Sequence, residues 1–297
     1  GYIAWNDPPE NSLRHIKLQT PPIPPGALPF VAVEGSTEAW PGSGSVPLLP
    51  QFDVFNKQTR YFEIFNQGSD PFDYTATADK PWIIISNRHG IVTDEQRLDI
   101  TIDWSILPPG THSGSVSVEA GGNMLNVSVT AFNPATPDPV TVEGFVEGDG
   151  YVSMEAESYT AVRETAGKRW ERIEDYGRTR SGMRATAFTD APPAVPGKDS
   201  PAMEYRMYLF SAGEFETTLH MAPSLNFLPD RDFKIGISLD DAEPQLISVV
   251  PAGFNAENGN RDWEETVRNS TRYVKGKITV TEPGYHTLKI WMVDPGM

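Results

Sequence analysis

The feature that most constrains the fold of this chain is a repeated alternation of short β-prone runs with turn residues. Residues 61–65 and 72–76 are rich in aromatic and β-prone residues, and a turn-rich stretch separates them. Residues 97–103 alternate polar and apolar side chains, as expected for a strand with one face in water. Residues 115–119 and 125–130 do the same on either side of Gly121-Gly122-Asn123, which predicts a β-hairpin. This pattern predicts an all-β fold.

Proline divides the chain into domains. Residues 1–30 contain seven prolines, which exclude a continuous helix or a central strand and indicate an extended lead-in from an upstream domain. Residues 134–140 contain three more and predict a stiff linker. We therefore expect two β-sandwich domains: an immunoglobulin-like sandwich over residues 31–133 and a jelly-roll sandwich over residues 141–297.

The second domain is expected to open with a strand at residues 151–159 and to contain a short helix at residues 262–267, where the acidic first turn suits the helix dipole. Further strands are predicted over residues 202–210, 214–221, 233–240, 245–250, 273–281 and 285–293. The sequence stops soon after the last of these, so we expect this sandwich to lack a final strand. It also begins without an initiator methionine or a leader, so we interpret it as a piece of a longer protein whose export signal lies upstream.

Charge and composition exclude several classes of function. Acidic residues outnumber basic ones by 40 to 24, and the net charge of −16 disfavours nucleic acid as a partner. No apolar run approaches the roughly 20 residues of a membrane span. Without cysteine there is no disulfide or thiolate metal site, and none of the five histidines lies at a metal-ligand spacing. Neither a nucleophile elbow nor a phosphate-binding loop is present, so the sequence gives no basis for nucleophilic or nucleotide chemistry.

Two glutamates form the first candidate site. Glu155 and Glu157 would project from the same face of the predicted strand, about 6.5–7 Å apart. Such a pair can bind a hard cation such as Ca²⁺ or act as acid and base in glycoside hydrolysis. It can equally lie on a solvent-facing strand edge, and no cleft is evident for catalysis.

The second candidate is an arginine-rich and aromatic segment at residues 168–182. Trp170 and Tyr176 offer flat rings for stacking on a sugar, and Arg178 and Arg180 offer guanidinium groups for the carboxylate of a uronic acid. The alternative is structural: the two rings fill the end of the sandwich and the arginines neutralise nearby acidic residues.

A series of short motifs along the chain follows the order of a known family. The motifs are GYIAWNDPPEN at residues 1–11, residues 33–53, residues 81–86 and 107–114, MEAESY at 154–159, WERI at 170–173, GRT at 177–179, LNF at 225–227 and DPG at 294–296. Together they resemble the C-terminal region of glycoside hydrolase family 115, the xylan α-glucuronidases. Residues 81–86 and 107–114 also resemble the BACON-type sandwiches of carbohydrate-active enzymes.

The resemblance carries further expectations. It implies a galactose-binding-like fold for the second sandwich and a structural calcium held by Glu155 and Glu157. It places the catalytic barrel upstream, so that no catalytic residue transfers to this chain and no cofactor is required. It also implies a secreted or periplasmic parent protein that is often a homodimer.

Three hypotheses follow. The first is that the chain is the non-catalytic C-terminal region of a xylan-active α-glucuronidase and supports binding of glucuronoxylan or its oligosaccharides. The second is a purely structural or dimerisation module without sugar contact, suggested by the aromatic and proline-rich lead-in. The third, an autonomous enzyme using Glu155 and Glu157, is the least favoured.

Overall fold

The computed structural model describes residues 22–187, 192–228 and 230–296. The chain divides into two compact units, one ending at Asn133 and the other beginning at Pro134. Strands dominate both, and the described residues contain a single helix. The all-β prediction is therefore confirmed. Most of the predicted lead-in falls on residues 1–21, which lie outside the described ranges.

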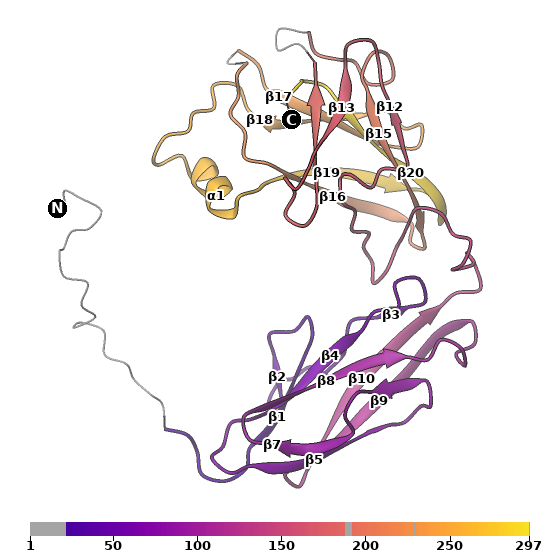
Figure 1. Cartoon of the computed structure of the whole chain (residues 1–297), viewed down its shortest axis with the longest axis vertical. Helices are drawn as coiled ribbons and strands as arrows, with labels where there is room; N and C mark the ends of the chain where they lie inside the picture. Colours follow the sequence, from indigo (N-terminus) through magenta and orange to yellow (C-terminus); the bar gives the residue numbers. More distant parts are fainter. Residues whose placement is uncertain (1–21, 188–191, 229, 297) are drawn as a thin grey trace, which may run out of the picture. The chain divides into compact units, whose positions relative to one another are not determined.

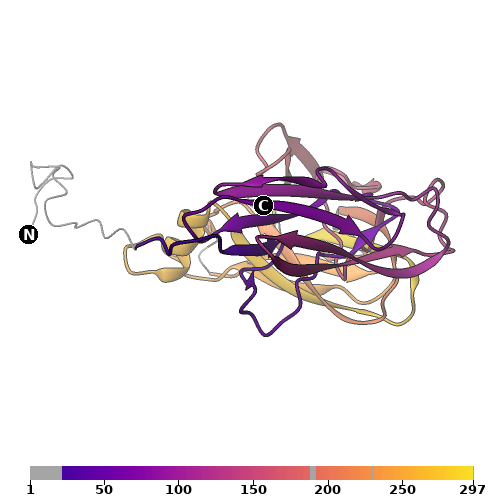
Figure 2. The same ribbon diagram turned by 90° about the horizontal axis from the view of Figure 1, so that it is seen from below.

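The first unit is a sandwich of two five-stranded sheets (Figure 1). Its strands are β1 Pro29–Val33, β2 Ala39–Trp40, β3 Phe52–Asp53, β4 Arg60–Asn66, β5 Phe72–Ala78, β6 Ile83–Ile85, β7 His89–Val92, β8 Glu95–Ile102, β9 Gly110–Ala120 and β10 Asn123–Asn133. One sheet has the order β2-β1-β4-β8-β6 and the other β3-β10-β9-β5-β7. Figure 2 shows the strands of this unit side by side and roughly aligned with one axis, and most neighbouring strands are antiparallel.

Side-chain alternation builds the core between these sheets. On β4, Phe62 and Ile64 are fully buried, whereas Tyr61 and Glu63 project from the outer face. The hairpin predicted between β9 and β10 is also confirmed. Its turn requires positive φ at Gly121 and Gly122, which glycine adopts without steric cost.

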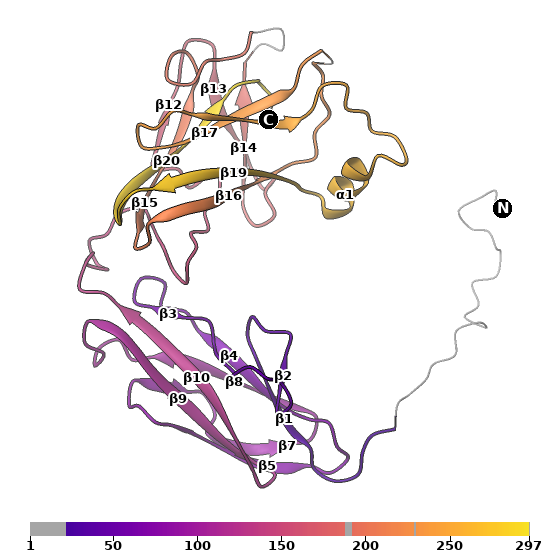
Figure 3. The same cartoon turned by 180° about the vertical axis from the view of Figure 1, so that it is seen from behind.

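The second unit contains a larger sheet and two separate ladders (Figure 3). Its elements are β11 Phe145–Val146, β12 Ala161–Arg163, β13 Arg169–Ile173, β14 Gly182–Thr186, β15 Ala202–Leu209, β16 Gly213–Met221, β17 Phe233–Leu239, β18 Gln245–Val250, α1 Arg261–Asn269, β19 Arg272–Val280 and β20 Gly284–Met292. The larger sheet runs β11-β15-β20-β17-β18, and β12 also pairs with β15. The ladders are β13 with β14 and β16 with β19, and residues of both enter the core beneath the larger sheet.

The prediction of a strand at residues 151–159 is wrong. Within it only Tyr151 forms an isolated bridge, and the Ser158 amide closes a turn onto the Glu155 carbonyl at 3.0 Å. The Ala156 carbonyl accepts the hydroxyl of the buried Tyr205 at 2.6 Å. The backbone of this segment therefore bonds to itself and to a core side chain instead of joining a ladder. A second difference is the hairpin of β13 and β14, which forms where no strand was predicted.

The helix predicted near residue 262 is confirmed as α1. The side chain of its N-cap residue, Asn260, accepts the Trp263 amide, and Asp262 and Glu264 lie in the positive first turn. Ser270 closes the other end in the left-handed conformation. Among the described residues no helix is long and apolar enough to cross a membrane.

A buried histidine of the second unit forms hydrogen bonds to residues of two turns. His286 is 8% exposed, and its Nδ1 lies 2.8 Å from a carboxylate oxygen of Asp240 while its Nε2 lies 2.9 Å from the Glu282 carbonyl. Both partners are acceptors, so only the protonated ring satisfies both nitrogens. Burial disfavours that charged form, but the bonds to Asp240 and Glu282 outweigh it and raise the pKa of His286 above its ordinary value.

This pair predicts a pH-dependent stability. Because the pKa is higher in the folded state, the stabilisation is fully present below the unfolded pKa of about 6.5 and is lost as pH rises through the folded value. His286→Gln should therefore lower the free energy of unfolding more at mildly acid than at alkaline pH, as measured in urea. NMR titration should give His286 a pKa above the ordinary histidine value of about 6.5. A cost of His286→Gln that does not change with pH would contradict the assignment.

Candidate functional site

Most of the residues singled out in the sequence come together in one exposed cluster of the second unit. Their contacts join the turn of the two glutamates, the connection between β13 and β14, and the outer face of β19. We call this cluster the arginine rim, and its members are Glu155, Glu157, Arg172, Tyr176, Arg178, Thr179, Arg180 and Tyr273.

A tight turn between β13 and β14 presents the central part of the rim. The Gly177 amide donates to the Arg180 carbonyl at 2.6 Å. A Cβ atom on residue 177 would lie 2.4 Å from that carbonyl oxygen, so only glycine fits. The turn leaves Arg178 and Arg180 exposed, and Tyr176 is 59% exposed while its ring packs on Gly182.

The two glutamates anchor this turn. The Glu157 side chain, 15% exposed, lies 3.5 Å from Nη1 of Arg172 and 4.0 Å from Nη1 of Arg180. Glu155 accepts a hydrogen bond from the Thr179 hydroxyl at 2.5 Å. Arg172 also donates to Glu174, and this bond raises the pKa of Arg172. Glu157 is thus shared by two guanidinium groups, and Glu174 supplies a second carboxylate to one of them.

Arg178 differs from its neighbours. Nη1 of its guanidinium donates to the Tyr273 hydroxyl at 3.4 Å, and it forms no ion pair with any carboxylate of the described residues. Tyr273 is 46% exposed on the outer face of β19 and meets the ring of His220, its cross-strand partner, edge-on at 5.0 Å. The rim therefore presents a guanidinium next to exposed phenol rings.

Trp170 does not belong to the exposed cluster. It is 7% exposed, packs in the core of the second unit, and donates its indole N–H to the Pro201 carbonyl at 3.3 Å. A buried ring has no face available to a sugar, so the structure supports the core-packing alternative for Trp170. On the solvent side of the same hairpin, Arg184 and Thr186 donate to Glu171 and lower the pKa of that carboxyl.

Sequence reasoning missed three members of the rim. Tyr273 was assigned only to the start of a strand, although its place in the outward set of the β19 alternation marks it as exposed. Arg172 and Thr179 carried no local signal, because their partners Glu157 and Glu155 lie 15 and 24 residues away in the sequence.

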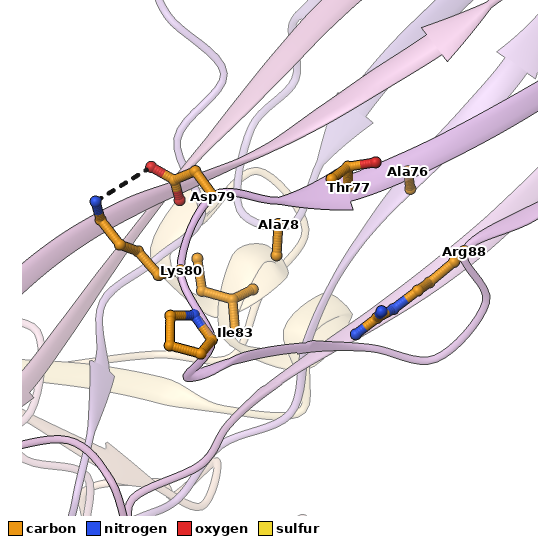
Figure 4. Close-up of a pocket in the computed structure, with 8 residues that line it drawn as sticks. Ala76, Thr77, Ala78, Asp79, Lys80, Ile83 and Arg88 are labelled. Atoms are coloured by element: carbon orange, nitrogen blue, oxygen red, sulfur yellow. Dashed lines mark ion pairs between the residues drawn. The ribbon is translucent and has the colours of Figure 1, made fainter.

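The first unit has a separate small hollow of about 270 Å³ (Figure 4). Lys80 and Arg88 flank it, and Ala76, Ala78 and Ile83 form part of its lining. Its one carboxylate, Asp79, pairs with Lys80 at 3.8 Å and accepts the Ser115 amide at 2.6 Å. Glycoside hydrolysis canonically needs two carboxyl groups, which this hollow alone does not supply.

Comparison with known proteins identifies the family. The profile of the glycosyl hydrolase family 115 C-terminal domain matches residues 144–297, slightly more than half of the chain. The chain belongs to glycosyl hydrolase family 115. Among curated proteins, no sequence matches this family 115 chain.

Solved structures share only limited similarity with the family 115 chain. A GH115 4-O-methyl-α-glucuronidase, BtGH115A, with specificity for decorated arabinogalactans, is 18% identical over 55% of this chain and 18% of its own, with a TM-score of 0.30. A GH5 xyloglucanase of Bacteroides ovatus is 18% identical over 36% of this chain and 20% of its own, with a TM-score of 0.24. The chain thus spans about a fifth of the length of either enzyme. Overlaps of this size carry no conclusion about function.

The residues of the family 115 chain that were expected to hold calcium do not fit that ion. Ca²⁺ takes six to eight oxygen ligands. Glu157 faces two guanidinium groups, and their positive charge disfavours a further cation there. Glu155 binds only the Thr179 hydroxyl. The described residues contain no group of three or more His, Asp or Glu side chains placed to hold a metal.

This misfit predicts that calcium leaves stability unchanged. A structural ion at 100 times its dissociation constant would add about 2.7 kcal/mol and raise the melting temperature by several degrees. We expect melting curves of the chain in millimolar CaCl₂ and in EDTA to coincide. A clear rise in CaCl₂ that Glu157→Gln abolishes would contradict the geometric argument.

The different environments of Trp170 and Tyr176 predict unequal costs when each ring is removed. Trp170→Ala should lower the free energy of unfolding by about 3–5 kcal/mol, since it empties a core position. Tyr176→Ala should change it by less than about 0.5 kcal/mol because the side chain is exposed. Urea unfolding of both variants would measure this. Equal costs would show that the two rings do not occupy different environments.

Proposed function

We propose that this chain is the non-catalytic C-terminal region of a family 115 α-glucuronidase and that its arginine rim binds glucuronoxylan. The observation that carries the proposal is Arg178: an exposed guanidinium that pairs with no described carboxylate and lies beside an exposed tyrosine ring. Membership of a glycoside hydrolase family supports a glycan as the ligand.

The chemistry of the rim suits a uronic acid on a polysaccharide. A guanidinium group can hold a carboxylate through two parallel charge-assisted hydrogen bonds. The rings of Tyr176 and Tyr273 offer apolar faces for stacking on the C–H groups of a sugar ring. Since Glu157 already pairs with Arg172 and Arg180, Arg178 is the guanidinium that takes the ligand's charge.

The same proposal places the rim beside a catalytic domain. In it the chain is linked to the domain that cleaves the glucuronic acid branch, and the parent protein acts outside the cytoplasm, where xylan is found. A binding module tethered to a catalytic domain raises the effective concentration of the polysaccharide at that domain. Binding at the rim then supports catalysis without a catalytic residue in this chain.

Affinity electrophoresis of the full chain in gels containing glucuronoxylan tests the proposal. Wild type should be retarded, and Arg178→Ala should bind roughly 10- to 100-fold more weakly, since it loses hydrogen bonds to a charged group. Arg178→Lys keeps the charge but not the planar fork and should show an intermediate loss.

Lys198→Ala is the matched control, because it also removes one exposed positive charge from the second unit. It should be retarded as wild type is. A wild-type chain that migrates freely in glucuronoxylan would overturn the proposal in favour of a purely structural or dimerisation role. If Arg178→Ala and Lys198→Ala lost retardation equally, binding would depend only on the net charge of the chain, and the role of the rim would be overturned.

A further inference from the structure

The outer face of the larger sheet in the second unit carries a row of aromatic rings. Tyr208 on β15 and Tyr285 on β20 are direct cross-strand partners, with ring centroids 5.0 Å apart and planes at 88°. Phe210, just beyond β15, lies 5.1 Å from Tyr208. On either side of Tyr208 along β15, Met207 and Leu209 are buried in the core, so the three rings belong to the opposite face of the sheet.

Two charged side chains border these rings. The guanidinium carbon of Arg206 lies 4.4 Å above the Tyr285 ring, and its Nη1 donates to Glu143 at 2.6 Å. The Glu143 amide donates to the Tyr285 hydroxyl at 3.4 Å. We call the five residues the aromatic strip: Glu143, Arg206, Tyr208, Phe210 and Tyr285. Arg206 and Glu143 are exposed, and Tyr285 is 43% exposed.

The backbone around the strip holds it in place. At Gly144, φ is +83° and a Cβ atom would lie 2.1 Å from the Arg206 carbonyl oxygen, so only glycine allows this segment to lie against β15 beside Glu143. The buried carboxylate of Glu147 accepts the amides of Phe210 and Ser211 at 2.7 and 2.9 Å. The three rings lie on the face opposite the core, where Tyr285 is exposed and Tyr208 and Phe210 are half-buried.

The chemistry of the strip indicates an uncharged, hydroxyl-rich ligand. Its one positive and one negative group neutralise each other, so no net charge is available to an ion. Planar Glu and Arg side chains supply acceptors and donors for adjacent hydroxyl groups, and aromatic rings supply faces and edges for apolar C–H groups.

We propose that the aromatic strip is a second carbohydrate-binding surface, specific for neutral pyranose rings of a polysaccharide backbone. It goes beyond the function proposed for the arginine rim, because it lies on other strands and needs no acidic sugar. A polysaccharide with acidic branches would then be held at two chemically different points.

Calorimetric titration of the full chain with two probes tests this inference. The probes are xylohexaose, which is uncharged, and an aldouronic acid of similar length. Tyr285→Ala should weaken xylohexaose binding about five- to tenfold by removing the ring, while Tyr285→Phe should retain it within about twofold. Glu143→Ala, on an exposed side chain whose loss leaves the core intact, should also weaken it several-fold.

Tyr151→Ala is the matched control, since this tyrosine of the second unit is also exposed and belongs to neither site. It should leave binding of both probes unchanged. Wild type that does not bind xylohexaose, or binding that Tyr285→Ala and Glu143→Ala leave intact, would overturn the second surface. Aldouronic acid binding that Arg178→Ala leaves unchanged would instead overturn the function proposed for the arginine rim.

Discussion

A single buried hydroxyl group positions the turn on which the arginine rim rests. Tyr205 lies in the core of the second unit, and burial raises the pKa of its phenol, so the group remains a neutral donor. It donates to the Ala156 carbonyl, midway between the two glutamates. Glu155 and Glu157 then hold the exposed turn through Thr179 and Arg180. The two glutamates and this hydrogen bond thus connect the exposed turn to the core of the second unit.

The distribution of charge explains how an acidic chain can present an anion-binding site. The net charge of −16 repels anions on average. Within the rim, however, Glu157 is shared by two guanidinium groups and Arg178 has no described acidic partner. The sign of the local field is therefore set by which groups are already paired. The aromatic strip offers no unpaired charge, because Arg206 and Glu143 neutralise each other there.

Much of the fold was predictable because its signals are local. Alternation over residues 97–103 marked β8, the glycine pair at 121–122 marked a hairpin, and the acidic start of α1 marked the helix. The segment at 151–159 shows the limit of this reasoning. Its alternating apolar residues imitate a strand, but its hydrogen bonds go to a local turn and to a side chain 49 residues away.

The site was predictable in composition but not in arrangement. The arginine-rich segment stood out, yet nothing local distinguished the buried Trp170 from the exposed Tyr176 in the same run. That difference arises because β13 directs the Trp170 side chain into the core. The strand was not predicted because charged residues interrupt its apolar pattern. The contact of Arg178 with Tyr273 spans 95 residues and depends on tertiary packing.

A crystal structure of the chain with a bound aldouronic acid would test the central claim most directly. The account predicts the uronate carboxylate within hydrogen-bond distance of the Arg178 guanidinium, with a sugar ring against Tyr176 or Tyr273. A ligand bound elsewhere on the chain, with Arg178 still directed only at the Tyr273 hydroxyl, would contradict it.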